Sequence, residues 1–266
     1  MSTKSTDARQ TRNSLGDISV LYVSVLMRAA AAEGADTTEL ASRFQLDRQT
    51  LTSPAARISI PRFMRLGHAA ISETGNPALG LRMGALSRPV DAGIAGLTGE
   101  TACTAGAAIS TLIRYALLTS RNSRGSPTIK PDTRQVLFYS IRPYNGFNYF
   151  VVDSVLAAWT QFLRNVTGRY EVLEKVTIEY PAIGLDQLFE SWFRCPVHFG
   201  APANSLTVRR DAWESPSLQA QPAMHEKLSE ICEREMQQIR RGWTTGDRVK
   251  NLLTPLFRGE TPNLGT

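Results

Sequence analysis

The chain has 266 residues, 42% of them hydrophobic and 20% charged, which is the composition of a globular protein large enough to bury a sizeable core. Thirty Lys and Arg against 24 Asp and Glu give a net charge of +6, scattered rather than concentrated, so a solvated mixed surface is favoured over a nucleic-acid groove. Three cysteines far apart in the sequence exclude a disulfide framework and indicate a reducing, cytoplasmic location, and no apolar run reaches the roughly 18 residues of a membrane span.

The N-terminal residues are polar, and we expect a disordered tail over residues 1–16. The apolar run "ISVLYVSVLM" follows at residues 18–27 and imitates the core of a signal peptide. However, Asp7 and Asp17 dilute the positive charge before this run, and Arg28 directly ends it. The run therefore predicts the start of a buried helix that continues through the following alanines.

Residues 37–51, "TTELASRFQLDRQTL", predict two short helices joined by a tight turn, with Asp47 opening the second helix. This order is that of a helix-turn-helix. The dipeptide Ser53-Pro54 ends the second helix after barely two turns, whereas a recognition helix continues further. Structural helices are therefore favoured here over a DNA-reading unit.

The middle of the chain mixes strand and helix patterns. Strand-like segments cover residues 135–141, 172–180, 197–199 and 205–208. Helical patterns cover residues 153–167 and 184–193, and a polar loop is expected over 120–132. Because no regular strand-helix-strand rhythm appears, the sequence predicts an α+β fold. We expect a helical N-terminal part, a small mixed or antiparallel sheet flanked by helices, and a long C-terminal helix.

That long helix is predicted over residues 222–241, as a linker or dimerisation element. Its apolar stripe consists of Met224, Leu228, Ile231, Cys232 and Ile239. Glu235 interrupts a heptad along this stripe. A seam between two copies of the chain and packing within one chain therefore both stay open.

Catalytic and metal-binding patterns are absent from the sequence. His68, His198 and His225 lie in separate segments, and "CPVH" at 195–198 offers two potential ligands where a zinc site needs three or four. No nucleophile elbow, zinc-protease motif or phosphate-binding glycine loop occurs. We therefore predict no catalytic residue, no metal and no cofactor, with an enzyme that lacks a recognisable motif as an alternative.

A ligand pocket is predicted where aromatic residues gather before and within the helical pattern of residues 153–167. The candidate ligand-binding residues are Arg142, Tyr144, Phe147, Tyr149 and Trp159, with Phe150 among the rings. The rings would hold an apolar body and the arginine an anionic group. The alternative, that the rings simply belong to the core, stays open.

Five motifs in order resemble one subfamily of AraC-type transcription regulators, whose N-terminal sensing domain is called arabinose-binding-like. "NPALGLRMG" (76–84) is similar to the family's Asp/Asn-Pro-x-x-Gly-Leu-x-x-Gly signature, and "SPAARISIPRFMRLGHAAISETG" (53–75) to its lead-in. "AAISTLIRYALLTS" (107–120) resembles a family helix. "VTIEYPAIGLDQLFESWFRCPVHFGAPANSLTVRRDAWESP" (176–216) resembles its hallmark segment. "DRVKNLLTPLFRGETPNLGT" (247–266) resembles the opening of its DNA-binding domain, although Pro255 departs from the helix expected there.

The resemblance implies a division of the chain. A ligand-sensing domain would span residues 17–216, a linker or dimerisation helix 217–243, and the start of a truncated DNA-binding domain 244–266. The two helix-turn-helix units of the family would lie mostly beyond Thr266, and residues 37–51 would belong to the sensing domain.

The implied function is sensing and dimerisation in a sequence-specific, DNA-binding transcription regulator. An unknown small-molecule effector would control paired C-terminal helix-turn-helix domains, and the expected partners are DNA, the effector and a second copy of the chain, with no membrane. The alternative is a small-molecule-binding or protein-interaction regulatory module without direct DNA contact.

Overall fold

The computed structural model describes residues 15–253, apart from the side chains of residues 247 and 250–252. The helices are α2 (Val20–Ala32), α3 (Thr37–Arg43), α4 (Arg48–Thr52), α5 (Ile60–Thr74), α6 (Leu79–Leu86), α7 (Gly93–Glu100), α8 (Ala105–Arg114), α9 (Tyr149–Thr167), α10 (Asp186–Phe193), α11 (Arg210–Trp213), α12 (Pro222–Arg241) and α13 (Thr245–Leu253). The described residues also form three short 3₁₀ turns, η1 (Pro89–Ala92), η2 (Ala116–Leu118) and η3 (Pro131–Thr133).

Two sheets accompany the helices. The strands are β1 (Gly16–Ser19), β2 (Arg57–Ser59), β3 (Ser120–Asn122), β4 (Thr128–Lys130), β5 (Gln135–Phe138), β6 (Leu173–Thr177), β7 (Val197–His198) and β8 (Asn204–Val208). A three-stranded antiparallel sheet has the order β2-β1-β3. A five-stranded sheet has the order β4-β5-β8-β6-β7 and is antiparallel except for the parallel pair of β6 and β7. The fold is α+β, as predicted.

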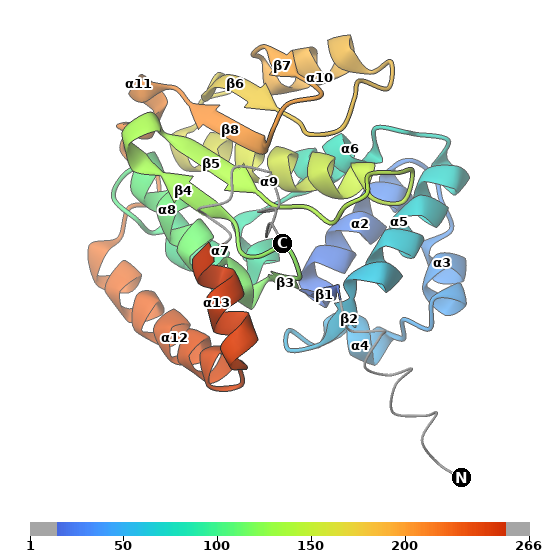
Figure 1. Cartoon of the computed structure of the whole chain (residues 1–266), viewed down its shortest axis with the longest axis horizontal. Helices are drawn as coiled ribbons and strands as arrows, with labels where there is room; N and C mark the ends of the chain where they lie inside the picture. Colours follow the sequence, from blue (N-terminus) through green and yellow to red (C-terminus); the bar gives the residue numbers. More distant parts are fainter. Residues whose placement is uncertain (1–14, 254–266) are drawn as a thin grey trace, which may run out of the picture.

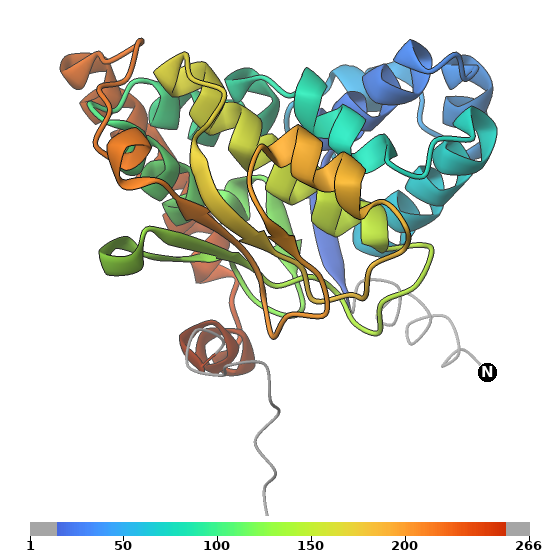
Figure 2. The same ribbon diagram turned by 90° about the horizontal axis from the view of Figure 1, so that it is seen from above.

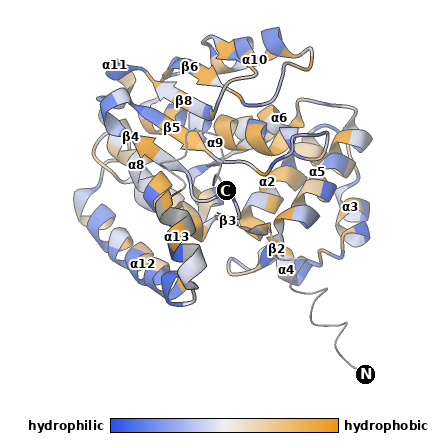
Figure 3. Ribbon diagram, viewed as in Figure 1, coloured by the Kyte–Doolittle hydropathy of each residue, from blue (hydrophilic) through white to orange (hydrophobic). Residues whose placement is uncertain are grey.

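The molecule is arranged around α9. Figure 1 shows the N-terminal helices α2 to α5 at one end of the long axis and α12 with α13 towards the other. Turned by 90°, Figure 2 shows α9 and α10 on the same side of the five-stranded sheet. Apolar residues run along α2, α6 and α9 in the middle of the molecule, whereas much of α12 is hydrophilic (Figure 3). α9 is therefore the central helix of the fold.

Two hydrophobic cores share this helix. One core lies among the N-terminal helices and includes Leu26, Phe63 and Met83, with Phe150 supplied by the first turn of α9. The other core lies between the sheet, α8 and the rest of α9, and includes Trp159. A helix that is apolar on nearly every side is buried on every side. α9 therefore forms the wall that both cores have in common.

The glycines of the motif at residues 76–84 explain how α6 reaches α9. A Cβ on Gly80 would lie 2.6 Å from the Cβ of Asp153, and a Cβ on Gly84 would lie 2.2 Å from the Cβ of Ala157. Both distances are far below van der Waals contact, so only glycine permits this close crossing of the two helices. The motif is thus a packing signature that fixes α6 on the central helix.

Most of the predicted elements are present. Each of the four expected strands occurs, as β5, β6, β7 and β8, and the expected helix over residues 222–241 is α12. Residues 37–51 form α3 and α4, capped by the side chains of Asp36 and Asp47, and α4 ends at Thr52. The second helix is therefore as short as predicted, which supports its structural role.

Two sequence predictions need correction. The helix expected from residue 18 begins at Val20, because Gly16–Ser19 pairs as β1 with two other strands. The loop expected over residues 120–132 contains β3 and β4. Strands of three or four residues are too short to show an alternating pattern, and they exist here because partner strands supply their hydrogen bonds, far along the chain for β1 and β3 and just after a short turn for β4.

Several expectations fall on residues that the structure does not describe. Residues 1–14 of the predicted tail and residues 254–266, including Pro255, lie outside the described part of the chain. Within residues 15–253, no helix has both the length and the apolar character needed to cross a bilayer.

Candidate ligand-binding site

A cavity of about 120 Å³ lies where the two cores meet. One wall is a stripe along α9, formed by Val151, Val155, Ala158, Trp159 and Phe162. These residues follow the spacing i, i+4, i+7, i+8, i+11 and therefore share one face of the helix. An apolar cavity of this scale accommodates a small organic molecule.

The remaining walls come from elements far apart in the sequence. The N-terminal core contributes Ile18 from β1, Tyr22 from α2, and Ile60 and Phe63 from α5. Opposite them, Phe138 at the end of β5 stands edge-on to Trp159, with ring centroids 5.9 Å apart. Apolar side chains thus predominate around the space, which favours an apolar ligand body.

A few polar groups interrupt this lining. Ser140, 1% exposed, lies in the cavity wall, and its Oγ has no hydrogen-bond partner among the described residues. Tyr22 donates its hydroxyl proton to Ser154 Oγ over 2.9 Å, and burial raises the pKa of Tyr22. A buried polar atom without a partner is costly, so the Ser140 hydroxyl is a ready anchor for a ligand.

Among the described residues that line the cavity, the charged side chains are Arg88 and Asp91. Asp91 accepts hydrogen bonds from Arg28 Nη2 at 2.6 Å and from the backbone N–H of Arg88 at 2.8 Å, with Arg88 Nη2 at 3.3 Å. The Arg88 side chain remains 62% exposed, against 10% for that of Asp91. Hydrogen bonds within the protein therefore satisfy the Asp91 carboxylate, whereas the Arg88 guanidinium stays largely at the surface.

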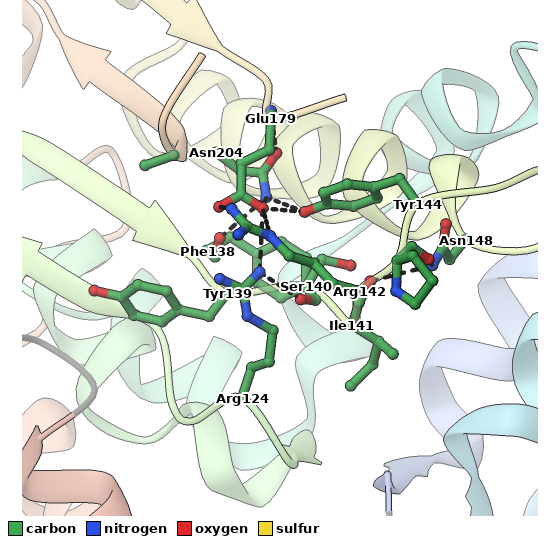
Figure 4. A network of polar contacts seen from close by, with 12 residues as sticks. Arg124, Phe138, Tyr139, Ser140, Ile141, Arg142, Tyr144, Asn148, Glu179 and Asn204 are labelled. Atoms are coloured by element: carbon green, nitrogen blue, oxygen red, sulfur yellow. Dashed lines mark hydrogen bonds and ion pairs between the residues drawn. The ribbon is translucent and has the colours of Figure 1, made fainter. Parts of the chain in front are cut away.

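The predicted ligand residues do not gather in one place. Trp159 lines the cavity, but Arg142, Tyr144, Phe147 and Tyr149 do not. Arg142 and Tyr144 belong instead to a polar network around Glu179 (Figure 4). The structure thus separates the arginine that was expected to bind an anion from the tryptophan that lines the cavity.

Glu179 is the centre of that network, and its side chain is only 4% exposed. Arg142 Nη2 lies 2.7 Å from Oε1, Arg124 Nη1 lies 3.1 Å from Oε2, and Tyr144 donates its hydroxyl proton to Oε2. Asn204 adds an amide contact of 3.3 Å to the same oxygen. Burial, followed by the hydrogen bond to Glu179, raises the pKa of Tyr144. This internal ion-pair network ties the loop after β5 to the sheet.

The other two predicted rings pack against protein. Phe147, 42% exposed, lies on His68 with ring centroids 4.1 Å apart. Tyr149 packs on the buried ring of Tyr180, with centroids 4.6 Å apart. Both rings hold the start of α9 in place.

A buried carboxyl lies beside these rings. Asp153 on α9 is 1% exposed and accepts a hydrogen bond from Tyr180, while its Oδ2 has no partner in the described part of the chain. Burial raises the pKa of Asp153 to about 8, although the Tyr180 hydrogen bond opposes the shift. Asp153 is therefore mostly protonated near neutral pH, in the same helix that lines the cavity.

Helix α12 lies against the body of its own chain. Cys232 is fully buried, with its Sγ 3.2 Å from Thr98 Oγ1 of α7, and Ile239 packs on the core near the sheet. Among the other predicted dimerisation residues, Leu228 and Ile231 are half-buried, and Met224 is 53% exposed. Packing within one chain therefore accounts for much of the apolar stripe, and the dimer seam stays a prediction.

The cavity and α12 are connected by a shared wall. A groove of about 840 Å³ runs between α12 and the three-stranded sheet, lined on the α12 side by residues such as Ile239 and by Trp243. Ala92, at the end of η1, and Thr119, just after η2, line both this groove and the cavity. Thr119 Oγ1 lies 3.4 Å from the carbonyl oxygen of Ala92. Ala92 and Thr119 thus belong to a wall that the cavity and the groove share.

The comparisons with known proteins agree with this architecture. Residues 34–217, well over half of the chain, match the family described as the arabinose-binding domain of AraC transcription regulators, N-terminal. The chain belongs to this family. The match includes the α6 signature, the hallmark segment at 176–216 and most of the residues that line the cavity, but not Ile18 and Tyr22, and it confirms the resemblance inferred from the motifs.

Two relatives are both regulators from Pseudomonas aeruginosa. The ornithine utilization regulator is 22% identical over 216 residues, which are 81% of this chain and 64% of that protein's length. The chain therefore spans somewhat less than two thirds of this relative. The crystal structure of the transcriptional regulator CdpR gives a TM-score of 0.52 at 15% identity, covering 82% of this chain and 67% of CdpR. This likeness shows a common fold.

Within residues 15–253, no group of three or more His, Cys, Asp and Glu side chains is placed to hold a metal ion.

The sequence interpretation missed the residues that shape the cavity, among them Ala158, Ser140 and Arg88. The apolar residues of the segment 150–163 carried a signal, because they are spread around the whole helix, and such a helix must serve two cores. No local signal marks Arg88 or Ser140.

Proposed function

We propose that this chain is the effector-sensing part of an AraC-type transcription regulator, and that a small molecule in the cavity controls the segment that leads to the DNA-binding domain. The observation that carries the proposal is the cavity between the two cores, which shares Ala92 and Thr119 with the groove beneath α12. Such a regulator would catalyse no reaction and would act in the cytoplasm.

The effect of a ligand in the cavity would reach α12 through η1 and η2, and we call this route the relay. Both turns border the cavity, and α12 packs against η2 and against α7, the helix that follows η1. His225 at the start of α12 also contacts the Thr98 carbonyl at 2.8 Å, and Glu233 accepts a hydrogen bond from Tyr115 at 3.0 Å. An effector that favours one position of these turns would shift the balance between two positions of α12.

The sensing step is tested by screening small organic molecules for thermal stabilisation of the 266-residue chain. Compounds that stabilise the wild type should lose their effect in Ala158→Phe, which fills the cavity, and keep it in Ala182→Phe, which alters an exposed residue. Circular dichroism checks that each variant is folded, and Ala158→Leu serves if the larger ring prevents folding. If the compounds stabilise all variants equally, the effector binds outside the cavity.

The relay is tested by hydrogen exchange on α12. A cavity ligand should change the exchange of residues 222–241, and Met236→Asp, which buries a charge beneath α12, should raise that exchange without any ligand. A cavity ligand that leaves α12 exchange unaltered would refute the relay.

DNA control and homodimerisation complete the proposal. A form that carries the family's complete DNA-binding domain should bind an operator fragment selectively and with strong salt dependence, whereas the 266-residue chain should bind it poorly. Failure of the longer form would favour a regulatory module without DNA contact. Light scattering of Met224→Glu against the wild type tests whether the exposed start of α12 contributes to a dimer.

A further inference from the structure

The charges at the cavity are unbalanced, and this imbalance points to a chemical class of effector. Among the described residues that line the cavity, Asp91 carries the one carboxylate, and two guanidinium groups pair with it: that of Arg88, which also lines the cavity, and that of Arg28, which does not. One positive charge is therefore left over next to an apolar space. A neutral ligand would leave this charge unused, and a cationic ligand would be repelled by it.

The two arginines differ in how firmly the fold holds them. Arg28 pairs with Asp91 at 2.6 Å and also donates to the carbonyl oxygen of Leu86 at 3.3 Å. Arg88 has the longer contact of 3.3 Å, and its backbone N–H rather than its side chain makes the shorter bond to Asp91. The carboxylate is thus satisfied by Arg28 and the Arg88 backbone, and the Arg88 guanidinium is the group that can turn to a ligand.

We propose that the effector is a small organic monocarboxylic acid, with its apolar aliphatic or aromatic body in the cavity and its carboxylate on Arg88. A guanidinium binds a carboxylate through two parallel hydrogen bonds, which no neutral oxygen group can match. The apolar stripe of α9 buries the body of the molecule, and a single surplus charge matches a single carboxylate. The inference rests on the proposed function of the cavity and adds the class of ligand.

The probes are straight-chain carboxylates of four to ten carbons and the primary alcohols of the same lengths, titrated into the 266-residue chain by calorimetry at pH 7. Each added methylene should tighten binding about fourfold until the cavity is full. At the best length, the carboxylate should bind about fivefold more tightly than the alcohol, which is the scale of an ion pair that keeps contact with water.

The deciding variant is Arg88→Gln, and the matched control is Arg210→Gln, which alters an arginine that is 76% exposed on α11. The first should reduce carboxylate affinity about fivefold and leave alcohol affinity within twofold, whereas the control should alter neither. Because Arg88 is largely exposed, this change should leave the fold intact, which a thermal melt checks.

Three outcomes would overturn the inference in distinguishable ways. Equal binding of acids and alcohols removes the acid class, and an Arg88→Gln variant that keeps the acid preference removes Arg88 as the partner of the carboxylate; both outcomes leave the proposed function of the cavity standing. If neither the carboxylates nor the alcohols bind, monocarboxylic acids are also excluded as the effector class. In that case the Ala158→Phe screen decides whether the proposed function survives with another ligand or fails with it.

Discussion

Asp153 offers the sharpest test of the physical account of α9. The change is Asp153→Asn, which keeps the shape of the side chain and its hydrogen bond from Tyr180 but cannot ionise. The side chain is 1% exposed, and burial raises its pKa from 3.8 to about 8. The wild-type fold must therefore hold a proton that the unfolded chain releases at neutral pH.

The release of this proton on unfolding determines how steeply the free energy of unfolding depends on pH. A group whose pKa is raised in the fold stabilises the protein fully below the unfolded pKa, and that contribution is lost as the pH rises towards the folded pKa. Between pH 5 and 7, unfolding of the wild type releases nearly one proton at Asp153, so the free energy of unfolding falls by about 1.4 kcal/mol per pH unit from this group. Asp153→Asn lacks this loss. Its free energy of unfolding relative to that of the wild type should therefore rise by about 2.7 kcal/mol between pH 5 and pH 7.

The assay is urea denaturation of both proteins at pH 5, 6 and 7, followed by circular dichroism. The control is Asp132→Asn, which removes a carboxyl at the surface and should give a curve parallel to the wild type. A constant difference between Asp153→Asn and the wild type across this range would refute the reasoning, because it would mean that Asp153 ionises in the fold as it does in the unfolded chain.

Two further changes test how the site is held in place. Gly84→Ala should lower the free energy of unfolding by about 2 kcal/mol in a denaturant titration, since the new Cβ would lie 2.2 Å from that of Ala157, whereas Gly146→Ala, with no atom within 4 Å, should cost little. Glu179→Gln should cost about 3 kcal/mol because it removes the buried carboxylate charge that pairs with two arginines, and the exposed Glu171→Gln should stay within about 0.5 kcal/mol of the wild type. Equal effects of a change and its control would contradict either account.

The larger elements of this protein follow from local patterns. The amphipathic stripe of residues 222–241, the alternation at 172–180 and the cap at Asp47 each predict an element that is present. These features depend on residues within one or two turns, whose spacing determines which face can be buried. The family signature at 76–84 is equally local, and its glycines are required by the crossing of α6 on α9.

The cavity and its chemistry depended on tertiary contacts. Arg142 appeared suited to an anion, but Glu179, 37 positions away, already pairs with it. Arg88 lies three positions before Asp91, but it becomes notable only because Arg28, 63 positions from Asp91, satisfies that carboxylate. The short strands β1 to β3 likewise exist through partners far along the chain. Local sequence thus decides which faces are apolar or charged, whereas only the folded chain decides which charge is left without a counterpart, because electrostatic pairing depends on distance in space.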